Sequence, residues 1–135
     1  MNRCVLDTDI LIEFFRRNAA VIGQVAAYLQ EYEQLSITII TYYEVLRGLR
    51  YVNVERQLNA LKNFVVDNEV LPLDELAIDQ AADVYAALRK NGQLIGEGDI
   101  LIAGIALAHR RVLVTNNTAH YSRVPGLQLE NWVKA

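Results

Sequence analysis

The sequence is poor in the residues that form disulfide frameworks and zinc sites. It contains one cysteine and two histidines among 135 residues. A single cysteine excludes a disulfide framework and a cysteine-based zinc site. Cys4 falls within an apolar run, so we expect a small buried side chain and a reducing compartment. His109 and His120 do not have the spacing of a zinc site, and we expect structural or surface positions for both.

Long apolar runs and an excess of positive charge are also missing. No run approaches the roughly 18 apolar residues of a membrane span, and the first residues do not have the pattern of a secretory signal. We therefore expect a cytoplasmic protein with no membrane partner. The formal net charge of −3 argues against a broadly basic nucleic-acid-binding surface. A nucleic-acid enzyme is still compatible with this charge, because bound divalent cations or a second chain can supply positive charge locally.

The chain does have a regular alternation of short β-branched runs and longer amphipathic stretches. The predicted strands are residues 4–6, 35–40, 69–73, 111–115 and, at an edge, 127–129. The predicted helices are residues 10–15, 19–33, 41–51, 54–68, 74–91 and 100–109, with a turn or short helix at 116–123. Strands that alternate with helices form parallel βαβ units. The sequence thus predicts a single domain over residues 1–135, a three-layer α/β/α sandwich with a four- to five-stranded parallel sheet.

Polar residues follow several of the predicted strands. Asp7 ends the first strand, and Glu44 lies in the first turn of the helix after the second. Asp99 closes a predicted tight turn at residues 96–99 and opens the buried helix before the fourth strand, which Asn116 and Asn117 follow. The carboxyl ends of parallel strands form the crevice where ligands bind, and neighbouring strands are about 4.8 Å apart. These side chains can therefore converge on one ion.

Each of these residues also has a purely structural interpretation. Asp7 can be the N-cap of the next helix, and Thr41-x-x-Glu44 matches a capping box. Asp99 can favour the positive end of its own helix, and the two asparagines are common turn residues. For each residue taken alone, both interpretations are open.

The set as a whole indicates a cation site. Clustered carboxylates repel one another unless they are protonated or bind a cation. Oxygen ligands without histidine or cysteine nearby favour Mg²⁺ or Mn²⁺. Mg²⁺ held by oxygens is suited to phosphate chemistry, since it can polarise the phosphoryl group, activate water and stabilise the leaving oxygen.

Four short segments, in this order and at this spacing, resemble a known family. They are residues 5–12 (VLDTDILI), residues 41–48 (TxxEVLRG), residues 98–103 (GDILIA) and residues 114–127, which contain VTNN and then YxRVPGL. Together they resemble the PIN-domain ribonucleases, specifically the VapC-like toxins of type II toxin–antitoxin pairs. The resemblance covers nearly the whole chain, and the combination of segments makes it specific.

The resemblance implies which residues hold the metal. The metal-binding acids of the family correspond to Asp7, Glu44 and Asp99, and its fourth acidic position corresponds to Asn117, which is neutral. An asparagine offers a carbonyl oxygen but no charge, so we expect one well-held Mg²⁺ or Mn²⁺ and a second ion recruited by the substrate. Asp9 compensates in part if its side chain turns inward, and is otherwise a first-turn helix acid.

The resemblance also implies the reaction, which is Mg²⁺-dependent endonucleolytic cleavage of single-stranded or looped RNA by in-line attack of activated water. The substrate-binding residues would be Thr8, Thr115, Arg16, Arg47 and Arg50. For Thr115 the alternative role is to end its strand, and for the arginines it is that of solvated helix charges.

The partners implied by the resemblance are a second copy of the chain and an antitoxin. Family members commonly form homodimers, and the C-terminal segment of a cognate antitoxin enters the acidic groove. Apolar and aromatic residues of the first helices are candidates for these surfaces, or else for the core: Phe14, Phe15, Tyr42, Tyr43 and Tyr51.

Two other functions are compatible with the sequence. A haloacid-dehalogenase-type phosphatase would use Asp7 as nucleophile and Asp9 as general acid, but that class also needs a lysine and a second acid where this chain has Ala103. A PIN-fold module that has lost activity through Asn117 would bind RNA or protein without cleaving. Metal-dependent cleavage of RNA separates the nuclease from the module.

Overall fold

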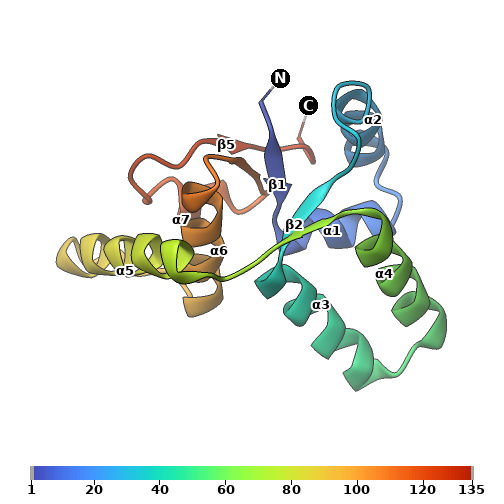
Figure 1. Ribbon diagram of the computed structural model, residues 1–135, viewed down its shortest axis with the longest axis horizontal. Coiled ribbons are helices and arrows are strands. Elements are labelled where there is room, and N and C mark those ends of the chain that lie inside the picture. The colour runs from blue at the N-terminus through green and yellow to red at the C-terminus, as the bar shows by residue number, and fades with distance from the viewer. Residues whose placement is uncertain (1, 135) are drawn as a thin grey trace.

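The computed structural model describes residues 2–134, and its centre is a five-stranded sheet in which every pair of neighbouring strands is parallel (Figure 1). The strand order is β3-β2-β1-β4-β5. The strands are β1 (Cys4–Leu6), β2 (Ser36–Thr38), β3 (Glu69–Leu71), β4 (Val112–Val114) and β5 (Leu129–Glu130). The helices are α1 (Thr8–Phe15), α2 (Ala19–Tyr28), α3 (Ile39–Val52), α4 (Glu55–Asp67), α5 (Glu75–Lys90), α6 (Glu97–Ala108) and α7 (Thr118–Tyr121).

Helices cover both faces of this sheet, which confirms the predicted three-layer α/β/α sandwich. Because side chains alternate across a strand, Leu6 and Val114 belong to the core on the side of α1, α2 and α4. Val5 and Leu113 belong to the core on the side of α5 and α6. All three residues of β1 are buried, as expected of a strand covered on both faces. In residues 2–134 no helix is long and apolar enough to cross a membrane.

The end of β2 differs from the prediction. We expected a strand to Ile40, but β2 ends at Thr38 and Ile39 already begins α3. The side chain of Thr38 accepts a hydrogen bond from the backbone N–H of Thr41 at 3.1 Å, so Thr38 is the N-cap. The capping-box interpretation of Thr41 and Glu44 is therefore wrong, and Glu44 lies in the second turn of α3 rather than in the predicted first turn.

The start of α6 is a second correction. We expected a tight turn at residues 96–99, but α6 begins at Glu97, with Gly96 at the N-cap position and Asp99 in the first helical turn. Several other boundaries are shorter or shifted. Helix α1 begins two residues early, α2 ends at Tyr28, β3 ends before Pro72, and the edge strand starts at Leu129.

Side-chain caps begin two further helices, and the cysteine is buried, as expected from its place in an apolar run. The side chain of Asn18 accepts from two backbone N–H groups at the start of α2, and that of Asp74 accepts from the Ala77 N–H at the start of α5. Burial raises the pKa of the Cys4 thiol to about 12, so this side chain stays neutral and behaves as a small hydrophobic group.

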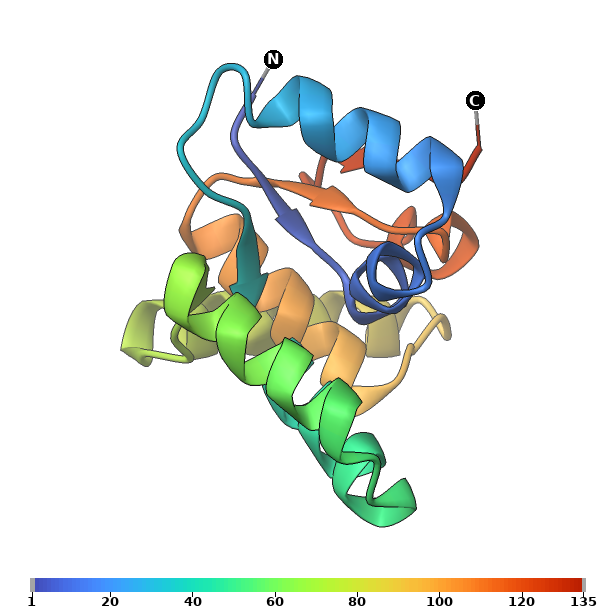
Figure 2. The ribbon, with the colours of Figure 1, turned by 90° about the vertical axis from the view of Figure 1, so that its right-hand side faces the viewer.

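Helices α3 and α4 form a hairpin that projects beyond the carboxyl ends of the strands (Figures 1 and 2). Asn53 ends α3 in the left-handed conformation, with φ of 55°, a backbone state that asparagine tolerates better than most residues. The hairpin thus forms one wall beside the edge of the sheet at which Asp7 lies.

Candidate active site

Asp7 is fixed where β1 meets α1. Its backbone N–H donates to the carbonyl of Val114, which ties it to the end of β4. One carboxylate oxygen, Oδ1, accepts from the Thr8 N–H at 2.8 Å, and the other, Oδ2, accepts from the Thr115 hydroxyl at 2.8 Å. Asp7 is only 5% exposed. It is the N-cap of α1, as its structural interpretation predicts, and its carboxylate also lies at the carboxyl edge of the sheet.

Asp99 lies close to Asp7, and both carboxylates contact the hydroxyl of one tyrosine. The hydroxyl of Tyr121 lies 3.0 Å from Oδ1 of Asp99 and 3.4 Å from Oδ1 of Asp7. The structure therefore brings together the two acids that the sequence predicted to meet. Tyr121 itself was not among the predicted site residues. The available signal was its place in the short segment after β4, which lies at the same sheet edge.

Electrostatics at this edge disfavour the charged forms. Burial, the charge of Asp9 and the charge of Asp99 raise the pKa of Asp7 to about 7, and the hydrogen bonds from Thr115 and Thr8 offset these effects only in part. Burial likewise raises the pKa of Asp9. Burial and the nearby acids raise the pKa of Tyr121, which stays a protonated donor. Residues 2–134 contain two side-chain ion pairs, and they use Glu13 and Glu69 rather than these acids.

Asp9 turns toward the end of β4. Its Oδ2 accepts from the backbone N–H of Asn116 at 3.0 Å. Its Oδ1 is buried and has no hydrogen-bond partner among residues 2–134. An unpaired buried carboxylate oxygen is costly, so Asp9 adds an unsatisfied negative group beside Asp7 and Asp99.

Glu44 approaches from α3. Its Oε1 accepts from the Thr8 hydroxyl at 2.6 Å, and that hydroxyl lies 3.0 Å from Oγ1 of Thr41. A Cβ atom at position 98 would lie 2.8 Å from Oε2 of Glu44, so Gly98 is what allows this carboxylate to reach the start of α6, beside Asp99. In this structure the Thr8 hydroxyl therefore contacts Glu44 and Thr41.

These donors fit a hydrated hard cation better than an enclosed one. Within residues 2–134, no three acidic, histidine or cysteine side chains are arranged as a ready-made metal cage. Mg²⁺ commonly keeps several waters and binds through one or two carboxylates together with substrate phosphates. The pair Asp7 and Asp99, joined by Tyr121, and the unpaired oxygen of Asp9 are compatible with an ion held in that way.

Asn117 and Thr115 lie at the end of β4 but differ in what they contact. The Thr115 hydroxyl donates to Asp7 and accepts from the Asn117 N–H at 2.9 Å. Thr115 is fully buried, and its hydroxyl holds the Asp7 carboxylate in place. The amide nitrogen of Asn117 lies 3.0 Å from Nδ1 of His120. The structure thus directs this amide group toward the exposed His120.

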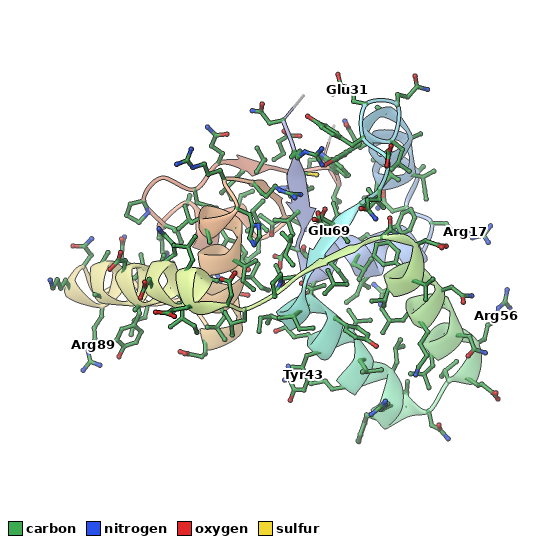
Figure 3. All side chains as sticks on the ribbon, in the orientation of Figure 1. Arg17, Glu31, Tyr43, Arg56, Glu69 and Arg89 are labelled. Atoms are coloured by element: carbon green, nitrogen blue, oxygen red, sulfur yellow. The ribbon has the colours of Figure 1, made fainter. Side chains whose placement is uncertain are left out.

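A groove of about 600 Å³ runs between α1, α3 and α4 and includes Glu44 in its lining. Of the predicted arginines only Arg16 lines it, and Arg17 and Arg56, which the sequence analysis missed, line it as well. Arg17 and Arg56 project on the same side of the molecule (Figure 3). A polar rim over apolar residues such as Phe15 and Leu49 suits the binding of an extended partner.

Arg47 and Arg50 occupy a different face of α3. The Arg47 guanidinium lies 5.1 Å from the ring centroid of Tyr43, and Tyr43 lies on the side of α3 away from α4 (Figure 3). Residues 43, 47 and 50 share one helical face, whereas Glu44, Val45 and Gly48 share the face that lines the groove. The helical period therefore separates these two sets.

The predicted aromatic surface residues also divide between the core and the surface. Phe14, Phe15 and Tyr42 are partly buried and pack against the core on the α1 side of the sheet. Tyr43 and Tyr51 are exposed, at 58% and 91%. Of these five residues, Tyr43 and Tyr51 are thus the surface groups, and the Tyr43 ring also contacts the Arg47 guanidinium.

Comparison with known proteins gives one consistent result. A family model described as PIN domain matches residues 4–127. The chain is 30% identical over 133 residues to the tRNA(fMet)-specific endonuclease VapC of Shigella flexneri, an alignment that covers 98% of this chain and 99% of the relative. It is 31% identical over 134 residues to Ribonuclease VapC2 of Haemophilus influenzae, over 98% of this chain and 100% of the relative.

Solved structures give a similar result. VapBC2 from Rickettsia felis, bound to a DNA fragment from its promoter, contains a chain with a TM-score of 0.86 and 25% identity, over 95% of this chain and 97% of that one. DNA-bound VapBC from Salmonella typhimurium gives a TM-score of 0.86 and 28% identity, over 98% and 99%. Both matches extend over nearly the whole fold.

Proposed function

We propose, since the chain belongs to the PIN domain family and to its VapC-like members, that it is a metal-dependent endoribonuclease and the toxin of a type II toxin–antitoxin pair. The observation that carries this proposal is the convergence of Asp7 and Asp99 on the Tyr121 hydroxyl, with no arginine or lysine of residues 2–134 paired to either acid. A group of negative charges that the chain leaves uncompensated is a place for a divalent cation. The match to the PIN family favours a nuclease or a non-catalytic PIN module over the phosphatase.

Each residue of the site has a proposed role. Asp7 and Asp99 would hold Mg²⁺ or Mn²⁺, Glu44 would add a third carboxylate oxygen, and Asn117 would add a carbonyl oxygen. A bound ion supplies positive charge that polarises the phosphodiester and makes a nearby water more acidic. Thr115 and the Thr8 N–H keep the Asp7 carboxylate in one orientation, and the Thr8 hydroxyl does the same for Glu44.

The substrate is RNA, and the arginines that guide it are those of the groove. Arg16, Arg17 and Arg56 line the same groove as Glu44, so a phosphate backbone held there passes close to the acids. Two relatives are named as an endonuclease specific for tRNA(fMet) and as a ribonuclease, which makes tRNA the first substrate to test. We also propose that the protein works in the cytoplasm and as a homodimer.

The antitoxin is proposed to use the same groove. The similar chains in the VapBC structures and the apolar floor with a basic rim support a partner segment that packs apolar side chains on Phe15 and Leu49 and places a polar group near Glu44. Such a segment would compete with RNA, because both would occupy the approach to the acids. Inhibition would follow from this competition.

The nuclease proposal is tested with tRNA, with Mg²⁺ or Mn²⁺, and with EDTA. We expect cleavage that needs the metal and that falls at least about 100-fold in Asp7→Asn and in Asp99→Asn, because each variant removes a charged ligand. Asp79→Asn is the matched control, since Asp79 lies on the exposed side of α5 and its loss should leave the rate unchanged. Binding of RNA without cleavage in either metal would favour the non-catalytic module.

A further inference from the structure

A buried phenol is the contact shared by the two principal acids. Tyr121 is fully buried, and its ring belongs to the core on the α5 and α6 side of the sheet. Its hydroxyl reaches out of that core to Asp99 at 3.0 Å and to Asp7 at 3.4 Å. Ring packing fixes the position of this hydroxyl, because a buried tyrosine ring has little freedom once its neighbours are in place.

The two acids depend on this hydroxyl to different degrees. Asp7 is also held by the Thr8 N–H and the Thr115 hydroxyl, one on each carboxylate oxygen. The hydrogen bond that the structure gives the Asp99 carboxylate comes from Tyr121, on Oδ1. Among residues 2–134, Oδ2 of Asp99 has no hydrogen-bond donor. Tyr121 therefore sets how Asp99 faces Asp7 and leaves one oxygen of Asp99 open.

We infer that Tyr121 is a positioning residue for the divalent cation, orienting Asp99 relative to Asp7 through its hydroxyl. This inference rests on the proposed function, in which both acids hold the ion. The donor and the ring have separate tasks. The ring fills the core, and the hydroxyl fixes the ligand, in the way that hydrogen bonds from outside the ligand set orient metal ligands elsewhere.

The test is Tyr121→Phe, which keeps the ring and removes only the hydroxyl. We expect Mn²⁺ affinity, measured by titration calorimetry without RNA, to fall about tenfold, within the range known for residues that orient metal ligands. In RNA cleavage at saturating Mn²⁺, kcat should fall and KM for RNA should stay within twofold, since the groove arginines are untouched.

Tyr28→Phe is the matched control. Tyr28 is also a buried tyrosine with 1% exposure, and its hydroxyl accepts from the Cys4 N–H at the opposite edge of the sheet. We expect this variant to lower the melting temperature, because it leaves a buried N–H without a partner, and to leave Mn²⁺ affinity and kcat unchanged.

The outcomes separate the inference from the proposed function. Wild-type Mn²⁺ affinity and kcat in Tyr121→Phe, with metal-dependent cleavage intact in the wild type, would overturn the inference alone. Equal losses of affinity in Tyr121→Phe and Tyr28→Phe would also overturn it, by pointing to a general loss of packing. A wild-type chain that neither binds Mn²⁺ nor cleaves RNA would overturn both.

Discussion

The two edges of the sheet treat their charged side chains in opposite ways. At the amino edge, Arg111 donates to the carbonyl of Cys4, to the Ser36 hydroxyl and to the Glu69 carboxylate, at distances of 2.9–3.3 Å. Ser36 donates to the same oxygen of Glu69 at 2.7 Å. This network joins the starts of three strands to the residue before β4, and its opposite charges are matched within the chain.

The carboxyl edge has acids and hydroxyls but no cation among the described residues that pairs with them. The consequence appears in the pKa values. Burial opposes ionisation of Glu69, yet the hydrogen bonds from Ser36 and Arg111 hold its pKa below the usual value. Burial and neighbouring acids raise the pKa of Asp7 to about 7. The amino edge therefore stabilises the sheet by itself, while the carboxyl edge keeps a negative charge that a bound cation would balance.

The largest contrast should appear in the pH dependence of the metal-free protein. The pKa of Asp7 rises from 3.8 to about 7 on folding, so the folded state holds this proton more tightly than the unfolded state. The stabilisation is complete below about pH 4 and is lost as the pH rises through about 7, by roughly 4 kcal/mol at most. Urea unfolding in EDTA at pH 5 and pH 8 covers about two of these three pH units, so it should show a loss of about 3 kcal/mol.

Asp7→Asn should remove most of that slope. The amide has no charge to bury, and with Nδ2 placed toward Thr115 the threonine hydroxyl can rotate to accept from it. We expect Asp7→Asn to be more stable than the wild type at pH 8 and to lose this advantage at pH 5. If the wild-type protein in EDTA became more stable between pH 5 and pH 8, the claim that ionised Asp7 destabilises the metal-free fold would be wrong.

A smaller effect is expected from the amino edge. Arg111→Met should lower the free energy of unfolding by about 2 kcal/mol, because Glu69 and Ser36 lose their cationic partner while Glu69, with its side chain 36% exposed, keeps partial access to water. The RNA cleavage rate per folded molecule should not change. Chemical unfolding and single-turnover cleavage measure the two quantities.

Arg89→Met is the control for this change, since Arg89 is an exposed arginine on α5 whose guanidinium contacts the ring and hydroxyl of the neighbouring Tyr85. Its removal should alter stability by less than about 0.5 kcal/mol. If Arg111→Met impaired cleavage in molecules that remain folded, the claim that the amino edge contributes to stability alone would be wrong.

The positions of the acids could be predicted because the topology places them. Strands that are parallel and linked by helices end at one edge, so Asp7 and the residues after β4 had to lie near each other. The boundary of α6 was predicted too late, yet Asp99 still fell at the correct edge. An error of three residues in the start of a helix leaves Asp99 at the same end of the sheet, whereas an error in strand direction would have placed it at the opposite end.

The hydrogen bonds could not be predicted in the same way. Tyr121, which reaches Asp7 and Asp99, lies in the one-turn helix α7 after β4, and a segment this short has no periodicity that would predict where its side chains point. The arginines are a different case. Arg47 shares a helical face with Tyr43, and Glu44 with Gly48, so the period of 3.6 residues could have placed Arg47 away from the groove.

The smallest expected effect concerns Asn117, the neutral residue that the resemblance in the sequence analysis assigns to a fourth acidic position. Asn117→Asp adds a charge beside the acids, which the metal-free protein tolerates less well and a bound cation tolerates better. We expect Mn²⁺ affinity to rise about fivefold, equivalent to about 1 kcal/mol, and metal-free stability at pH 8 to fall slightly. Asn117→Ala, which also removes the contact with His120, is the control and should not raise affinity. Unchanged calorimetric affinity in Asn117→Asp would place residue 117 outside the metal site, and Asp9, with its unpaired buried oxygen, would then be the remaining candidate for a fourth acidic ligand.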